Sequence, residues 1–199
     1  GGLTNIIGLG SYSAPDTTPF ESAIVAGQSN SILGNSSNGT GSAIACVIVG
    51  GTSNSLSGAL SVILGGSNNT NGGQGSIVGG TNSSVGNGTL YGFAFGNDAD
   101  VGAASHGSVA IGTNAGISDG CQDSFAFGNG SSVGAGGACN NSFAFGKSAS
   151  VQDSVNGGDY CVAMGRRALA NDTGCFVFSD STDANYDGTT KTNSFAARF

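Results

Sequence analysis

The stretch SFAFGKSASV at residues 142–151 decides the fold, because close copies of it recur along the chain. The copies are GFAFGNDADV at 92–101, SVAIGTNAGI at 108–117, SFAFGNGSSV at 124–133 and the more divergent CVAMGRRALA at 161–170. Self-similarity at a nearly fixed spacing indicates a repeat architecture in which each copy is one structural unit.

A second form of the repeat occupies the first half of the chain. It reads SAIVAG at 22–27, CVIVGG at 46–51, SVILGG at 61–66 and GSIVGG at 75–80. Both forms place a small residue three positions after the last glycine, and most copies add an apolar residue two positions later. Nine or ten units therefore cover nearly the whole chain.

Composition narrows the class of protein. The 199 residues include 38 glycines, and 9% are charged while 38% are hydrophobic. Abundant Gly, Ser and Asn is typical of flexible linkers, but a linker does not keep its hydrophobic residues at a regular period, so we exclude disorder. The net charge of −7 and five scattered cations argue against nucleic acid as a partner. No apolar run approaches the roughly 20 residues of a membrane-spanning helix, so we expect no membrane insertion.

The alternation Phe143, Ala144, Phe145 has the period of a β-strand, and Gly146 allows the chain to bend after it. A second short strand then closes a coil of roughly 15 residues, and stacked coils bond through their backbones. We predict an all-β protein, a parallel β-roll or β-solenoid of about nine to ten short rungs. The structural repeat residues of this prediction are Gly96, Gly112, Gly128, Gly146, Gly165, Phe125, Phe127, Phe143 and Phe145.

The two faces of each strand are assigned different functions. We expect the phenylalanine face to fill the coil. We expect the small Ala and Gly face to pack against copies of itself in a homotrimeric fibre.

Four segments follow from the repeats. Residues 1–21 are assigned to a neck or cap, 22–90 to β-roll repeats of the Ile-Val-Gly-Gly type, and 91–179 to repeats in which Ala separates two large apolar residues before Gly. Residues 180–199 are assigned to a C-terminal cap or transition segment.

The phrase at 108–115 resembles the head repeats of trimeric autotransporter adhesins, over about 90–170 and more loosely over 22–85. That resemblance implies a left-handed parallel β-roll trimer. The tail at 176–199 resembles a segment that follows such repeats in phage and viral fibre proteins and in related bacterial surface proteins. There it ends the roll and often leads towards a C-terminal intramolecular chaperone domain.

One candidate metal site lies in this tail. Asp183, Asn185 and Asp187 precede Gly188, which matches the first half of a calcium loop. The twelfth position is Ser194 rather than a bidentate Glu, and a solvated cap loop is the stronger interpretation. Apart from this Ca²⁺ candidate, we expect no cofactor.

Other reactive residues favour structural interpretations. The five cysteines show no metal-binding spacing. Cys161 and Cys175 are expected on adjacent rungs, where the distance allows a disulfide but a reduced, serine-like ladder is favoured. The pairs Asp98/Asp100, Asp119/Asp123 and Asp180/Asp183 have the residue type of glycosidase acids, but they occur in predicted turns. We treat His106 as a surface residue, and Arg166 and Arg167 as ion-pairing or solvent-facing.

We therefore predict no enzyme but a structural fibre or spike segment of a virion, such as a phage tail fibre, that presents host-attachment surfaces. The expected partners are the chain itself, neighbouring fibre or virion proteins, and a host-surface glycan or protein receptor. The alternatives are a bacterial trimeric adhesin at the cell surface and a fibre-borne polysaccharide depolymerase. An ice-binding solenoid is disfavoured because no Thr-x-Thr ladder is visible.

Overall fold

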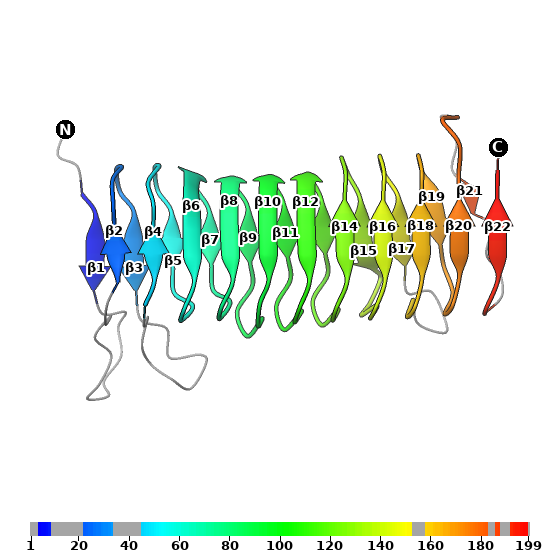
Figure 1. The fold of residues 1–199 in the computed structure, drawn as a ribbon, viewed down its shortest axis with the longest axis horizontal. Coiled ribbons are helices and arrows are strands. Elements are labelled where there is room, and N and C mark those ends of the chain that lie inside the picture. The colour runs from blue at the N-terminus through cyan, green and yellow to red at the C-terminus, as the bar shows by residue number, and fades with distance from the viewer. Residues whose placement is uncertain are drawn as a thin grey trace.

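The protein is a rod built of two parallel β-sheets whose strands lie across its long axis, with the termini towards opposite ends (Figure 1). The computed structural model describes residues 4–8, 22–33, 45–152, 158–182, 186–187 and 192–198. No helix occurs in these residues. The prediction of an all-β parallel solenoid is confirmed.

Each sheet contains eleven strands, and the chain alternates between the two sheets. Sheet A consists of β1 (Ile6–Gly8), β3 (Ser31–Leu33), β5 (Ser55–Leu56), β7 (Thr70–Asn71), β9 (Ser84–Val85), β11 (Asp100–Val101), β13 (Gly116–Ile117), β15 (Ser132–Ala135), β17 (Ser150–Gln152), β19 (Ala168–Ala170) and β21 (Tyr186–Asp187). Sheet B consists of β2 (Ala23–Ile24), β4 (Val47–Ile48), β6 (Val62–Ser67), β8 (Ile77–Thr81), β10 (Phe93–Asn97), β12 (Val109–Thr113), β14 (Phe125–Phe127), β16 (Phe143–Phe145), β18 (Val162–Met164), β20 (Phe176–Phe178) and β22 (Phe195–Ala197).

Successive rungs pair in register, so equivalent residues of the repeat form columns along the rod. Phe125, Ala126 and Phe127 lie opposite Phe143, Ala144 and Phe145, for example. Eleven strands at the usual spacing of about 4.8 Å give a rod about 50 Å long. β1 and β22 extend the sheets into the terminal segments.

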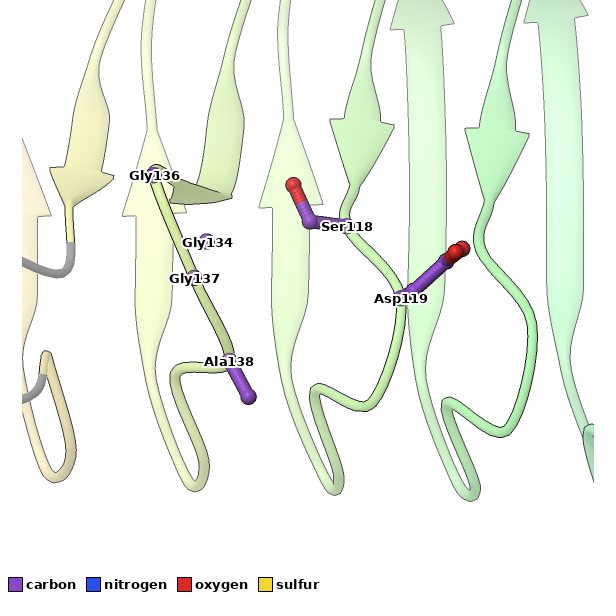
Figure 2. Close-up of a pocket in the computed structure, with 6 residues that line it drawn as sticks. All are labelled: Ser118, Asp119, Gly134, Gly136, Gly137 and Ala138. Atoms are coloured by element: carbon purple, nitrogen blue, oxygen red, sulfur yellow. The ribbon is translucent and has the colours of Figure 1, made fainter.

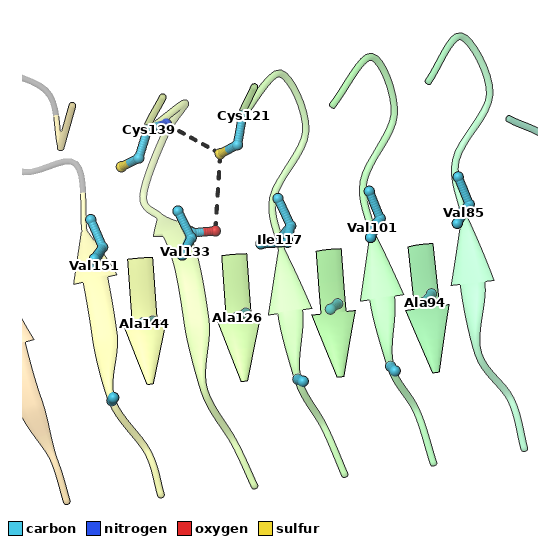
Figure 3. Packing of buried hydrophobic residues seen from close by; sticks show 14 of the residues in the cluster. Val85, Ala94, Val101, Ile117, Cys121, Ala126, Val133, Cys139, Ala144 and Val151 are labelled. Atoms are coloured by element: carbon cyan, nitrogen blue, oxygen red, sulfur yellow. Dashed lines mark hydrogen bonds between the residues drawn. The ribbon is translucent and has the colours of Figure 1, made fainter. Parts of the chain in front are cut away.

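The interior is a narrow space that receives one column of side chains from each sheet (Figure 3). Sheet A supplies Val85, Val101, Ile117, Val133 and Val151, which are 0–1% exposed. In this part of the rod sheet B supplies the fully buried Ala94, Ala110, Ala126 and Ala144. The β-branched column and the alanine column belong to one hydrophobic core, which also includes the buried cysteines and the corner residues Ala99, Ala115 and Ala149.

The prediction that phenylalanine fills the coil is therefore wrong, as is the prediction that the alanine face packs against other copies. Ala144 is fully buried, whereas Phe145 is 50% exposed. The cause is the lack of space: Val151 from sheet A already occupies this level of the core, and close-packed interiors accept added methylene groups only with strain.

Buried hydrogen-bond ladders support the corners of the coil. Asn54 Nδ2 donates to Asn30 Oδ1 and Asn69 Nδ2 donates to Asn54 Oδ1, both at 3.0 Å. The same amide of Asn54 also donates to the carbonyls of Gly50 and Gly66. Because buried polar groups are costly unless bonded, these contacts explain why asparagine recurs in the first half. After Asn69 the column continues as the buried Ser83, Ala99 and Ala115.

Asn71 interrupts the apolar column of sheet A, yet its rung is intact. Its amide nitrogen donates to the carbonyls of Val62 at 3.1 Å and Ser76 at 3.0 Å. Its Oδ1 accepts from the backbone nitrogen of Gly73. The side chain is fully buried and bonded, so the exception in the repeat is a local polar substitution.

Enlarging an interior alanine tests which face lies inside. We expect Ala144→Leu to lower the free energy of unfolding by about 1–3 kcal/mol, because the added atoms overpack the core. The matched control is Lys147→Leu on the same rung, where the side chain is exposed and the change should stay within about 0.5 kcal/mol. Denaturant unfolding at one protein concentration measures both; equal stability of the two variants would contradict the assignment.

Candidate interaction surface

The outward face of sheet B carries two columns of apolar residues, which we call the apolar stripe; polar residues such as Asn97 and Thr113 end some of its strands. The first column begins each strand and the second lies two residues later, which puts both on the same side of the sheet. The first column is Ala23, Val47, Val62, Ile77, Phe93, Val109, Phe125, Phe143, Val162, Phe176 and Phe195. The second column is Val25, Val49, Leu64, Gly79, Phe95, Ile111, Phe127, Phe145, Met164, Phe178 and Ala197.

Aromatic rings stack along this stripe in the second half of the rod. The ring centroids of Phe125 and Phe143 are 6.3 Å apart, and those of Phe127 and Phe145 are 6.4 Å apart. Offset and tilted pairs at these separations are favourable. The rings nevertheless remain half-buried or exposed, because only one side of each is covered.

Bulky side chains also flank the stripe. Leu60, Tyr91 and Tyr160 occupy the position two residues before the first column, and each has a positive φ between 56° and 59°. Asp123 and Asn141 occupy the same position on other rungs. A left-handed backbone is unfavourable for large side chains, and Tyr91 and Tyr160 are still 72% and 67% exposed. Exposed bulky side chains therefore flank the stripe at three rungs, and polar ones flank it at others.

The outward face of sheet A is polar. Its column includes Ser55, Thr70, Ser84, Asp100, Ser132 and Ser150. The hydroxyls of Ser132 and Ser150 lie 2.9 Å apart, and Ser84 donates to the carboxylate of Asp100. The two faces of the rod thus differ sharply, one apolar and one hydroxyl-rich.

The repeat glycines lie where each strand of sheet B turns. Gly146 has φ 131°, and a Cβ on it would meet the carbonyl oxygen of Gly165 at 2.4 Å. Gly96, Gly112, Gly128 and Gly165 also have positive φ and an equally close carbonyl from the next rung. A side chain would therefore force the stacked rungs apart.

A polar hollow of about 460 Å³ opens beside β15 (Figure 2). Its lining is Ser118, Asp119, Gly134, Gly136, Gly137 and Ala138. The carboxylate of Asp119 accepts a hydrogen bond from the backbone nitrogen of Ala103 at 2.7 Å. The hollow thus brings together one hydroxyl and one carboxylate that already has a partner, and it assembles no pair of acids.

The structure does not describe the side chains of the predicted calcium ligands. Asp183 and Asn185 lie outside the described residues, and only the backbone of Asp187 is described, in β21. Within the described ranges, no three His, Cys, Asp or Glu residues gather as metal ligands would.

The other candidate acids are dispersed along the rod. Asp98 occupies a corner with positive φ, and Asp180 forms an ion pair with Arg198 at 3.0 Å. His106 is half-buried, and its Nδ1 accepts from the backbone nitrogen of Leu90 at 3.0 Å. Arg166 donates to the carbonyl of Ser181 at 3.3 Å.

The cysteines replace serines in buried ladders. Ser142 Oγ accepts from the backbone nitrogen of Cys161 at 3.1 Å, just as Ser124 Oγ accepts from Ser142. Cys161 Sγ in turn donates to the carbonyl of Asp172 at 2.8 Å. Cys161 and Cys175 precede the paired strands β18 and β20, which confirms their placement on adjacent rungs. All five cysteines are buried thiols rather than disulfides.

In comparisons with known proteins, no protein-family model, no curated protein and no solved structure matches the chain. Among the described residues there is also no helix long and apolar enough to span a membrane.

Sequence reasoning found the residues of the stripe but assigned them to the interior, and it missed the exposed Tyr91, Tyr160 and Leu60. The sequence nevertheless indicates that the stripe residues and these three flanking side chains face outward. Asp123 and Asn141 lie two residues before Phe125 and Phe143, in the same phase of the strand alternation. Because Asp and Asn favour the surface, the phenylalanines in phase with them face outward.

The buried thiols give a prediction about reactivity. Burial raises the pKa of the Cys161 thiol to about 11. Since the thiolate is the nucleophile, Cys161 in the native protein at pH 8 should react with iodoacetamide at least about a hundredfold more slowly than a thiol of ordinary pKa. Peptide mass spectrometry of native and guanidinium-unfolded samples measures both rates. Equal rates would contradict the buried ladder.

Proposed function

We propose that this chain is a structural segment of a homotrimeric fibre or spike on a virion, which spaces and presents host-attachment surfaces. The observation that carries the proposal is the apolar stripe, which runs along the whole rod without a charged residue. Large contiguous apolar patches on a protein surface mark interaction sites.

The stripe favours a second copy of the chain as its partner. Its side chains recur at the rung spacing of about 4.8 Å, and a parallel copy carries the same spacing. A net charge of −7 makes copies repel one another at other surfaces. Association through the uncharged stripe avoids this repulsion. The resemblance to trimeric adhesin heads implies that three chains associate. A trimer would bring three stripes together around the fibre axis.

The remaining surface fits presentation rather than catalysis. The outer face of sheet A is rich in hydroxyls, and the loop at Gly134–Ala138 forms an open polar hollow. We propose that such irregular loops contact a host glycan or protein receptor. The buried thiols favour assembly in a reducing cytoplasm, as expected for a virus particle.

The proposal predicts the mass and its dependence on the stripe. Sedimentation velocity should give three times the 19.1 kDa chain mass. Phe145→Lys should weaken association at least about tenfold, because it places three like charges in the desolvated interface.

The control for this change is Thr70→Lys on the polar face, where the side chain is exposed and the trimer should persist. A wild-type protein that sediments as a stable, β-rich monomer would refute the proposal.

A further inference from the structure

The apolar stripe has one gap, at Gly79. The second column carries a large side chain on every rung from Val49 to Phe178 except this one. The gap is an open hollow of about 390 Å³, lined by Leu64, Gly65, Gly66, Gly79, Gly80 and Phe95. Its volume is more than ten times the roughly 30 Å³ that a water molecule occupies in the liquid.

A β-bulge creates the hollow. Ile63 pairs with Val78, but the next paired residues are Gly66 and Gly80. Leu64 and Gly65 of β6 are thus opposed by Gly79 alone in β8. This rung, with Val78 in the core, separates rungs that bury Ile48 and Ile63 from rungs that bury Ala94 and Ala110. On this rung Ser83 replaces asparagine in the corner ladder, and its backbone nitrogen donates to Asn69 Oδ1 of the rung before.

The chain closes the hollow only in part, because its own Phe95 ring covers Gly79, which is buried. The ring of Phe95 leans towards Gly79, so that a Cβ there would lie 2.8 Å from Phe95 Cε2 and 3.5 Å from Leu64 Cβ. Leu64 and Phe95 nevertheless remain 48% and 43% exposed. Two large apolar side chains therefore border a space that is open towards the partner side of the stripe.

We infer that this hollow fixes the axial register of self-association, by receiving Phe95 of a second copy. The inference rests on the proposed homotrimer. At zero axial offset, the Phe95 rings of all copies converge one rung above Gly79. There the Phe95 ring of each copy can enter the hollow of a neighbouring copy, which is lined by Gly65, Gly66, Gly79 and Gly80.

The need for such a device follows from the repeat. A ladder of similar apolar side chains at a constant spacing of about 4.8 Å pairs almost equally well after a shift of one rung, because each side chain then meets another of similar polarity. A shift by one rung leaves the open part of the hollow, between Leu64 and Phe95, without a partner side chain and forfeits contacts there. It also sets Phe95 against a large residue such as Ile111. Only the in-register arrangement fills the gap.

Filling the hollow with a side chain of the same chain tests this inference. We expect Gly79→Leu to weaken association at least tenfold in sedimentation experiments. The control is Gly116→Leu, on the polar face, where a Cβ meets no atom within 4 Å. It should assemble as the wild type does. Unchanged assembly of Gly79→Leu overturns the inference.

A second pair of variants covers a folding failure of Gly79→Leu, which circular dichroism would reveal. Phe95→Ala should weaken association more than Phe145→Ala, since both rings are similarly exposed but only Phe95 borders the hollow. Equal effects overturn the inference.

Photocrosslinking reads the register directly. Benzoylphenylalanine replaces Phe95, and unlabelled chains are refolded together with ¹⁵N-labelled chains so that links between copies are distinguished by mass. We expect links from position 95 to residues 64–66 and 79–80 of another chain. Links to other rungs overturn the inference while leaving the fibre proposal intact, whereas a monomeric wild type refutes the fibre proposal itself.

Discussion

The backbone bonds between successive rungs determine everything else in this molecule. Because each strand pairs in register with its equivalents above and below, every residue of the repeat lies in a column of similar residues. A constraint on the residue type at one position of a rung therefore applies to the same position of every rung. The glycines must admit the carbonyl of the next rung, and buried serine, asparagine and cysteine side chains must bond along the rod.

The narrow interior is the second consequence of this stacking. In the second half of the rod the core holds one β-branched side chain and one alanine per rung, as at Val133 and Ala126. In the first half, larger pairs such as Ile48 and Leu56 fit inside. The two forms of the repeat therefore differ in the size of the side chains that fill the core. As the inner residue shrinks to alanine, the outer residues grow to phenylalanine, so apolar surface moves from the core to the stripe.

Much of the fold could be predicted because periodicity is a property of the sequence alone. The spacing of the glycines gives the rungs, and the alternation at 143–145 gives the strands. Alternation does not say which face is inside, and choosing phenylalanine on hydrophobicity gave the wrong answer. Asp123 and Asn141, two residues before Phe125 and Phe143, indicate that these phenylalanines lie on the outward face. The hollow at Gly79 was beyond sequence reasoning, because it arises from opposed strands of unequal length. The calcium candidate at Asp183 and Asn185 lies outside the described residues.

The central claim is that phenylalanine lies outside each chain and is covered only by other copies. Hydroxyl-radical footprinting of Phe95 and Phe145 over a range of protein concentrations tests it most directly. We expect both rings to be oxidised in dilute, dissociated protein and protected when the protein assembles, with the backbone structure unchanged by circular dichroism. Protection of both rings at every concentration would place them inside the coil and contradict this account.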